Sequence, residues 1–440
     1  MNRKLFALIA LAIVVLAMLA ACASPTVAPT AAPQPTSAPA SSASSVSSSA
    51  APSSSAPSAA KFDRNIKIGI VDTYSGPPAA YGNDALNGFK LAINEINKDG
   101  VGGVKIEFVT RDDKYAPDVA LSMAKELVLQ EKVDVLVGTV NSAAALAISA
   151  YAKEQKIPYI VWIAKSENVT GAQGHRYVFM TSENTAMAGK AGAQGLAKKP
   201  YVKYWIAGED YEYGHALADS TWKNLQALKP GVQLVNQTWW KTGEPDLVPY
   251  MTQIAAAKPD AVIFATGGGG MTNAIKTAKS TGLLDKVPAW FHTGTDFTVL
   301  KPLGADAPEG LLGTMDYHFY YPDTPANKAF VAAFNEAYKT PPGFPAFHAY
   351  VTANLIANAY KKAGALDKEK FIDAIEGLVV PSPAGDVEMR KCDHQAVLPM
   401  FFGVTKKTSA YDFPISTDIV AVAGKDVMPS CDDITKLRAK

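Results

Sequence analysis

The sequence predicts an α/β protein made of two doubly wound lobes, each built on a parallel sheet. From residue 66 onward, short β-branched or aromatic runs alternate with longer segments of helical period, which indicates parallel strands covered by helices on both faces. The alternation repeats about eight or nine times, which is more than one sheet comfortably holds. A chain of 440 residues with 48% apolar side chains also has enough core for two lobes.

The elements follow in order from this alternation. The first strand is expected over 66–71, and Leu86, Phe89, Ile93 and Ile96 then mark the apolar face of the first helix. Further strands are expected over 104–109, 133–137, 158–163, 201–207, 232–239, 261–265 and 288–292. Helices are expected over 117–130, 142–155, 213–228, 247–257, 271–281, 325–339, 347–363 and 368–378. We assign the strands up to residue 163 to the first lobe and those from 201 to about 313 to the second.

The N-terminus has the pattern of a bacterial lipoprotein signal peptide over residues 1–21. Arg3 and Lys4 precede an uncharged apolar run that is too short to span a membrane comfortably. The run ends in Leu19-Ala20-Ala21-Cys22, which resembles a lipobox, the motif in which the cysteine is lipidated. The alternative is an ordinary secretory signal in which Cys22 is incidental.

Residues 22–61 are expected to form a disordered tether. Between residues 23 and 60 there are 13 Ser, 12 Ala and 7 Pro and no charged side chain, a composition that cannot bury enough apolar surface to fold. A lipid at one end and a folded part at the other suit a protein that works near a membrane without entering it.

The two remaining cysteines, Cys392 and Cys431, are expected to form a disulfide, because thiols outside the cytoplasm most simply pair. Two buried free thiols remain the alternative.

Charge and motifs exclude several classes of function. The chain has 42 basic and 41 acidic side chains and no basic cluster, so nucleic acid is not an expected partner. The six histidines lack metal-ligand spacing, and neither a Gly-x-Ser-x-Gly elbow nor a dinucleotide fingerprint is present. We therefore expect no metal, no cofactor and no catalytic residue.

A family resemblance extends over essentially all of residues 61–423. It rests on Ile66-Lys67-Ile68-Gly69-Ile70, Ser75-Gly76-Pro77, Tyr81-Gly82, Gly88, Glu95-Ile96-Asn97, the run 133–138 followed by Asn141-Ser142, Tyr213-Gly214 and the aromatic-rich stretch 344–363. In this order the segments resemble type I solute-binding proteins of the branched-chain amino acid (leucine/isoleucine/valine) ABC transporter family.

The resemblance implies a periplasmic-binding-protein type I fold, the Venus flytrap, whose lobes are joined by a three-crossover hinge. The crossings are expected near Thr181, Met315 and Ala384. Lobe 1 would then comprise 62–181 and 316–384, and lobe 2 would comprise 182–315 and 385–440.

The implied function is that of an extracytoplasmic, lipid-anchored, monomeric binding protein and not an enzyme. It would deliver a small amino acid or a related organic acid or amide to an ABC permease and its ATPase by domain closure. The alternatives are a ligand-sensing receptor domain for a membrane kinase or chemoreceptor and, less favoured, an exported hydrolase.

In lobe 1 the candidate ligand-binding residues follow three strands, because ligands of open parallel sheets bind beyond the carboxyl ends of the strands. They are Tyr74, Tyr81, Asn141, Ser142, Ala143, Trp162, Ala164 and Lys165. Asn141, Ser142 and Ala143 begin a helix whose amides suit a carboxylate, although Asn141 or Ser142 could merely cap that helix. Lys165 could meet a carboxylate or point to solvent, and Trp162 could form a ligand wall or belong to the core.

In lobe 2 the candidates are Tyr211, Tyr213, Gly269, Thr293 and Asp296. The tyrosines offer flat apolar walls with a polar tip, and glycines permit close approach, although ring packing and a tight turn are the alternatives. Thr293 stands where amino-acid binders of the family carry the acid that pairs with the ligand ammonium. Asp296 could replace that acid or cap the next helix. This departure favours a carboxylate or amide without an ammonium group.

Overall fold

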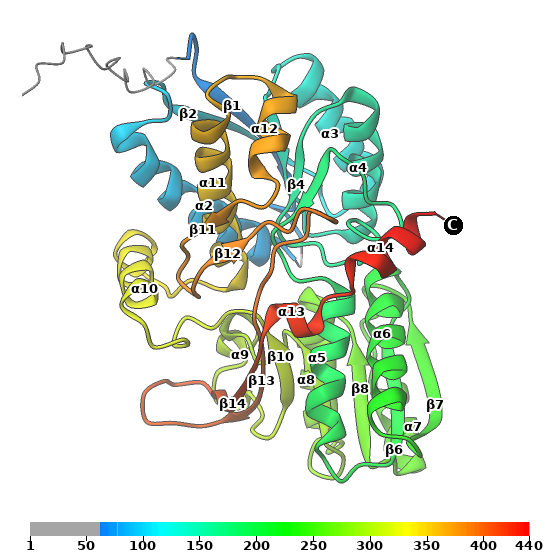
Figure 1. Ribbon diagram of the computed structural model, residues 1–440. Coiled ribbons are helices and arrows are strands. Elements are labelled where there is room, and N and C mark those ends of the chain that lie inside the picture. Colours follow the sequence, from blue (N-terminus) through cyan, green and yellow to red (C-terminus); the bar gives the residue numbers. More distant parts are fainter. Residues whose placement is uncertain (1–61, 77, 440) are drawn as a thin grey trace, which may run out of the picture. The chain divides into compact units, whose positions relative to one another are not determined.

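The computed structural model describes residues 62–76 and 78–439 (Figure 1). The predicted signal peptide, Cys22 and the whole of the predicted tether lie outside the described residues. Two large sheets organise the described chain. Among these residues no helix is both long and apolar enough to cross a membrane.

The first sheet has five parallel strands in the order β2-β1-β3-β4-β5. They are β1 (Ile66–Asp72), β2 (Ile106–Asp112), β3 (Val135–Val137), β4 (Tyr159–Val161) and β5 (Val178–Met180). The inner strands β3 and β4 are buried along their whole length, as expected of a sheet covered on both faces. The chain order reverses between β1 and β3, and such a switch point is where ligand sites form.

The second sheet has seven strands in the order β14-β13-β10-β9-β8-β6-β7. They are β6 (Lys203–Glu209), β7 (Gln233–Trp240), β8 (Ala261–Ala265), β9 (Ala289–His292), β10 (Leu312–Met315), β13 (Met400–Lys406) and β14 (Ile415–Val422). The five strands from β10 to β7 are parallel, whereas β13 pairs antiparallel with both β10 and β14. The expectation of a purely parallel sheet is therefore wrong for this edge. Two further strands, β11 (Val379–Val380) and β12 (Val387–Glu388), form a small antiparallel ribbon.

Helices cover the two sheets. Those of the first half are α2 (Ala79–Asp99), α3 (Pro117–Leu129) and α4 (Ser142–Gln155), and those between β5 and β10 are α5 (Thr185–Ala197), α6 (Glu212–Leu228), α7 (Val248–Ala257), α8 (Gly268–Ser280), α9 (Phe297–Leu300) and the 3₁₀ helix η1 (Lys301–Asp306). The later ones are α10 (Pro325–Tyr338), α11 (Phe344–Ala363), α12 (Lys368–Ile375), α13 (Gly424–Val427) and α14 (Cys431–Arg438). In Figure 1, α5 and α6 lie side by side along the second sheet, and the two helices are in direct contact.

Helix α11 returns to the first lobe and packs against α2. A Cβ at Gly88 of α2 would lie 2.1 Å from the carbonyl oxygen of Ala346, so only glycine permits this approach. Asp84, one turn earlier, accepts hydrogen bonds from the backbone N–H groups of Gly343 and Ala346, both at 3.0 Å. These contacts join two helices that are about 260 residues apart and fix the start of α11 beside the first βα loop.

The chain passes between the two sheets three times. The first crossing follows β5, and the second follows β10 at Met315. The third follows β12, and it runs beside the first because Met180 forms a parallel bridge with Gln395. The side chain of Gln395 also donates to the carbonyl of Ser182 at 2.6 Å. Ala384 lies in the turn of the β11–β12 ribbon, so the last crossing lies later in the chain than residue 384.

The C-terminal segment is tied back by a covalent link. Cys392 and Cys431 form a disulfide with a Cα–Cα distance of 5.8 Å. Arg438 of α14 donates to the carbonyl oxygens of Thr170 at 2.8 Å and Gly171 at 3.2 Å. The end of the chain therefore contacts the loop between β4 and β5 as well as the third crossing.

Candidate functional site

A cavity of about 500 Å³ lies where the carboxyl ends of strands from both sheets face each other. Its walls come from segments that follow β1 to β4, from segments that follow β6 to β9, and from the start of α11. The lining residues are Ser75, Gly76, Pro78, Tyr81, Lys114, Tyr115, Val140, Ser142, Ile163, Lys165, Glu209, Tyr211, Tyr213, Thr242, Gly243, Glu244, Pro245, Gly267, Gly268, Gly269, Gly270, Asn273, Thr293 and Phe344. The volume and the enclosure by two sheet edges are those of a small-molecule site.

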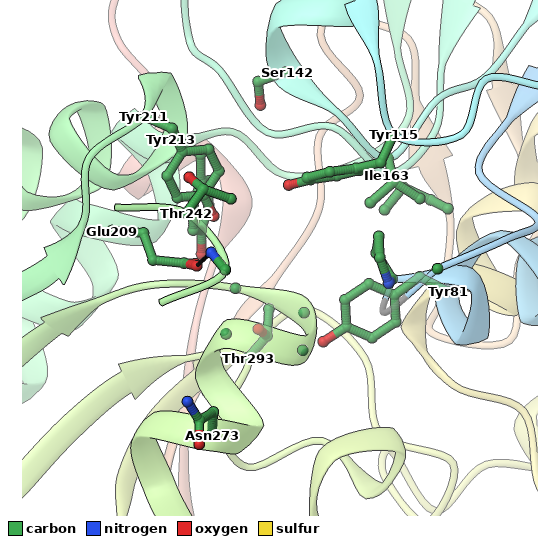
Figure 2. A pocket seen from close by; sticks show the side chains of 18 of the residues that line it. Tyr81, Tyr115, Ser142, Ile163, Glu209, Tyr211, Tyr213, Thr242, Asn273 and Thr293 are labelled. Carbon is green, nitrogen blue, oxygen red and sulfur yellow. Dashed lines mark hydrogen bonds between the residues drawn. The ribbon is translucent and has the colours of Figure 1, made fainter. Parts of the chain in front are cut away.

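Aromatic rings form most of the apolar wall. Figure 2 shows Tyr81 and Tyr115 on one side of the cavity and Tyr211 and Tyr213 on the other. Tyr81 meets Phe344 edge to face, with ring centroids 5.2 Å apart, and Tyr211 and Tyr213 lie 5.7 Å apart. Burial raises the pKa of Tyr213 well above its usual value, so its hydroxyl stays protonated at neutral pH. The site therefore offers flat apolar surfaces with neutral polar tips.

The glycine-rich start of α8 brings the two sides together. Gly268 has φ +56°, a left-handed conformation that favours glycine. A Cβ at this position would lie 3.6 Å from Cβ of Pro78 and 3.8 Å from the ring of Tyr81. This loop thus contacts the first βα loop of the opposite sheet and closes one edge of the cavity.

A hydrogen-bonded link between the two sides lies beside the cavity. The carboxylate of Glu212 at the start of α6 accepts from Ser166 Oγ at 2.6 Å and from Asn168 Nδ2 at 2.9 Å. Ser166 and Asn168 follow β4, whereas Glu212 follows β6, so this link holds the two halves of the site at their present separation.

Lys165 presents the buried cation of the cavity wall. Its side chain is 7% exposed, and its ammonium lies 2.5 Å from Oε1 of Glu183 and 4.5 Å from the centre of the Phe344 ring. Glu183 itself is fully buried in the first crossing. Burial alone would raise the pKa of the Glu183 carboxyl, but Lys165 and two neighbouring histidines hold it well below its usual range. The expected alternative, in which Lys165 points to solvent, is wrong.

The two histidines reach Glu183 from different elements. His292 at the end of β9 lies 2.9 Å from Glu183 through Nε2, and His348 of α11 lies 3.5 Å away through Nε2. His348 Nε2 also bonds Asp316, which follows β10. We call Lys165, Glu183, His292, Asp316 and His348 the hinge cluster, because Glu183 and Asp316 stand in the first and second crossings.

A second buried polar group supports the rim of the cavity in lobe 1. Asp72 at the end of β1 accepts from the N–H groups of Thr73 and Val140 and from the indole of Trp162. Asp113 accepts from the hydroxyl of Thr73 and from the N–H of Tyr115. Burial, together with the charge of Asp113, raises the pKa of Asp72 to about 7. We call Asp72 and Asp113 the carboxylate pair.

Glu209 is the buried acid of the cavity wall in lobe 2. Its carboxylate accepts from the hydroxyl of Thr266 at 2.7 Å and from the N–H of Gly243 at 3.3 Å. Figure 2 shows it beside Thr242, turned toward that loop. These bonds tie the segments after β6, β7 and β8 together.

Seven of the thirteen ligand-binding residues expected from the sequence line the cavity, namely Tyr81, Ser142, Lys165, Tyr211, Tyr213, Gly269 and Thr293. The other six, Tyr74, Asn141, Ala143, Trp162, Ala164 and Asp296, are not in its wall. Asn141 caps α4 by accepting from the N–H of Ala144, and Asp296 caps α9 by accepting from the N–H of Thr298. Trp162 is fully buried and donates to Asp72 at 2.6 Å, which is a core role.

Several wall residues were not among the expected ones. Tyr115 follows β2, and Thr242 to Pro245 follow β7, so the same rule about strand ends would have found both segments. Phe344 was not expected in the wall because the helix predicted from residue 347 begins three residues earlier in the structure, at Phe344. Glu183 had no local signal, since its three partners, Lys165, His292 and His348, come from three other segments of the chain.

Three members of the hinge cluster have the donor set of a metal site. One ligand atom each of Glu183, Asp316 and His348 lies within 4.8 Å of the others. The ammonium of Lys165 already supplies a positive charge at the Glu183 carboxylate, and all three side chains are fully buried. The geometry therefore fits an internal ion-pair cluster better than a site that takes up a cation from solution.

Residues 65–410 match the family model described as periplasmic binding protein. The leucine-, isoleucine-, valine-, threonine- and alanine-binding protein of Pseudomonas aeruginosa is 26% identical, over 73% of this chain and 85% of that protein.

Two solved structures of similar proteins carry aromatic acids. The solute-binding protein of an ABC transporter from Rhodopseudomonas palustris BisB5, in complex with 3,4-dihydroxybenzoic acid, is 26% identical with a TM-score of 0.74, and the match covers 82% of this chain and 98% of that one. A solute-binding protein from R. palustris in complex with benzoate is 27% identical with a TM-score of 0.73 and the same coverage. With a matched model over most of the chain and two sheets joined by three crossings, the protein belongs to the type I periplasmic binding proteins of the branched-chain amino acid transporter family.

Proposed function

We propose that the protein is the extracytoplasmic substrate-binding protein of an ABC importer and that its ligand is a small aromatic carboxylate. The observation that carries the proposal is the cavity itself, in which aromatic walls from both lobes surround a single buried lysine. Relatives that bind branched-chain amino acids and relatives that bind benzoates both support the import function.

The choice of an aromatic carboxylate over an α-amino acid rests on the acids near the cavity. Thr293 occupies the wall position where the family pattern places an acid, and Asp296 is committed to capping α9. Glu209 accepts hydrogen bonds from two neighbouring segments. A ligand ammonium would have to share the Glu209 carboxylate with these donors, whereas a flat ring with a carboxylate would contact the tyrosines and share the Lys165 ammonium with Glu183.

Ligand binding would shift the lobes toward a closed state by contacts with both of them, and the permease would recognise that state. Lobe 1 in this proposal comprises 62–181 and the segment from residue 316 to the end of β12, and lobe 2 comprises the rest of the folded chain. A lipid on Cys22 and the tether would keep the protein near its permease.

The test is a calorimetric titration of the purified protein with benzoate, 4-hydroxybenzoate, leucine and valine at pH 7. We expect the two aromatic acids to bind and the amino acids to bind at least tenfold more weakly. Tight binding of leucine without binding of either benzoate would contradict the proposed ligand class. It would leave the import function standing, because relatives of both kinds serve ABC transporters.

The anchor has its own test. In cells, replacement Cys22→Ser should abolish labelling of the protein by a radioactive fatty acid and release it from the membrane fraction. Continued membrane association of that variant would contradict lipid anchoring.

A further inference from the structure

The hydrogen bonds of the hinge cluster define where its protons are. His348 Nδ1 lies 2.9 Å from the carbonyl oxygen of Trp162, which can only accept, so Nδ1 carries a proton. Nε2 of the same ring bonds the carboxyl of Asp316. One more proton must lie between these two groups, on the ring or on the carboxyl, and in either case the pair His348–Asp316 has no net charge.

His292 is neutral in this arrangement. Its Nε2 lies 2.9 Å from an oxygen of the ionised Glu183, outside hydrogen-bond direction, and a proton on Nε2 avoids placing the nitrogen lone pair against the carboxylate. Its Nδ1 lies 2.9 Å from Thr314 Oγ1 and accepts from that hydroxyl. Burial lowers the pKa of His292, which agrees with a neutral ring at pH 7.

The charges of the hinge cluster consequently balance without a ligand. Lys165 and Glu183 cancel, and the remaining members are neutral as pairs or rings. Two further titratable side chains of the described residues, Asp296 and Tyr213, interact with members of this cluster. Asp296 is the buried cap of α9, and burial raises its pKa to about 6, whereas Tyr213 stays protonated.

An anionic ligand would disturb this balance. If a carboxylate approaches Lys165, two anions share one ammonium, and the side chains of Lys165 and Glu183 are only 7% and 0% exposed. An uncompensated buried charge costs several kcal/mol, so the cluster has a strong drive to acquire a compensating positive charge.

We propose that binding of a carboxylate ligand is coupled to the uptake of one proton by His292, which makes Glu183 and His292 determinants of ligand charge. Lys165 turns its ammonium from Glu183 to the ligand, and His292 becomes the cation that pairs with Glu183. The proton comes from solvent and adds to Nδ1, while the hydroxyl of Thr314 rotates from donor to acceptor. The inference rests on the proposed aromatic carboxylate ligand.

The coupling predicts selectivity by charge. The negative charge of a bound carboxylate is compensated by the proton that His292 takes up. A neutral ring of the same shape gains no contact with the Lys165 ammonium, because that ammonium stays paired with Glu183. Linkage then requires the dissociation constant of benzoate to rise with pH, by up to about tenfold per pH unit above the pKa of free His292.

Calorimetric titration of the whole protein with benzoate, in buffers of different ionisation enthalpy at pH 7, measures the protons directly. We expect uptake of about one proton per benzoate. In His292→Gln, which keeps a donor toward Glu183 but cannot gain charge, the uptake should fall to about zero and the pH dependence of the dissociation constant should flatten. His175→Gln is the matched control, since His175 bonds Ser149 away from the cavity, and it should keep full uptake.

The replacement Glu183→Gln should strengthen benzoate binding and is a second, independent test of the inference. The amide removes the competing charge, so benzoate should bind more tightly than to the unchanged protein and without proton uptake. A thermal melt of each variant shows that it is folded.

Binding of benzoate with no proton uptake would overturn the inference and leave the proposed function intact. Full uptake in folded His292→Gln would also overturn it, because the proton would then lie on another group such as Asp316. If no aromatic carboxylate binds at all, the proposed ligand class fails and the inference fails with it.

Discussion

Two buried clusters of charged groups in the described chain, the hinge cluster and the carboxylate pair, are balanced in different ways. The hinge cluster joins two carboxylates to a lysine and two histidines drawn from both lobes. The carboxylate pair Asp72–Asp113 is bound by hydroxyl and N–H groups, and among residues 62–76 and 78–439 neither carboxylate has an ion-pair partner. The first cluster pairs opposite charges from segments of both lobes, whereas the second keeps an unfavourable like-charge contact inside one lobe.

This contrast shows that the burial of a charged group does not by itself decide whether the group supports the fold or takes part in ligand binding. The backbone N–H groups of Thr73, Val140 and Tyr115 donate to the carboxylate pair, which thereby holds three loops of the cavity rim together. In the hinge cluster, by contrast, a bound carboxylate would change which charged groups pair with one another. Replacing single members should therefore have effects of opposite sign in the two clusters.

The largest effect is expected for Lys165→Gln. It leaves Glu183 buried without its cation, which should lower the free energy of unfolding by about 3–5 kcal/mol and abolish measurable benzoate binding. Chemical denaturation and calorimetry check the two results. The double replacement Lys165→Gln with Glu183→Gln should recover most of the stability and none of the binding. No recovery in the double variant would contradict the pairing of these two side chains.

The next effect concerns the carboxylate pair and pH. Because the pKa of folded Asp72 is raised to about 7 from an ordinary 3.8, its favourable contribution is complete below pH 4 and is lost as pH rises toward 7. The loss amounts to at most about 4 kcal/mol in the free energy of unfolding. Denaturation at pH 5 and pH 8 should show this fall, and Asp72→Asn should reduce it. Asp118→Asn, at an exposed position of α3, is the control and should leave the pH dependence unchanged.

A moderate effect is expected in the aromatic wall. Tyr213→Ala removes one ring from the cavity and should weaken benzoate binding by about 1–2 kcal/mol, which is roughly five- to thirty-fold. Tyr213→Phe keeps the ring and should bind within about threefold of the unchanged protein. Equal losses in both variants would mean that the hydroxyl matters and the ring does not.

The smallest effect is expected at the link between the halves of the site. Glu212→Ala removes the acceptor shared by Ser166 and Asn168 and should raise the dissociation constant of benzoate about two- to fivefold, the range of a partly exposed polar link. Glu154→Ala, an exposed position on α4, serves as the control. An unchanged dissociation constant in Glu212→Ala would show that this link does not contribute to ligand binding.

Much of the fold was predictable because the apolar period along most segments agrees with the way in which those segments pack in the structure. The helix expected over 142–155 has those bounds in the structure, and the strand over 261–265 does as well. Strands β13 and β14 were missed. Apolar and polar residues alternate only weakly along β14, which lies at an exposed edge, and the antiparallel pair departs from the regular alternation of strands and helices. Strand β5 has only three residues and gave too short a pattern.

The cavity was predictable in its position and only partly in its residues. The rule about strand ends placed Tyr211 and Tyr213 near Ser142 and Lys165, and the structure brings all four to one wall. The rule could not separate a residue that faces the cavity from one that caps a helix, which is the case of Asp296. The hinge cluster was beyond local reasoning, since five segments spread over residues 165–348 create it.

A crystal structure of the protein with benzoate tests the central claim most directly. The account predicts the ring among Tyr81, Tyr115, Tyr211 and Tyr213, with its carboxylate within hydrogen-bond distance of the Lys165 ammonium. Benzoate bound outside this cavity, or with its carboxylate turned away from Lys165, would contradict the account.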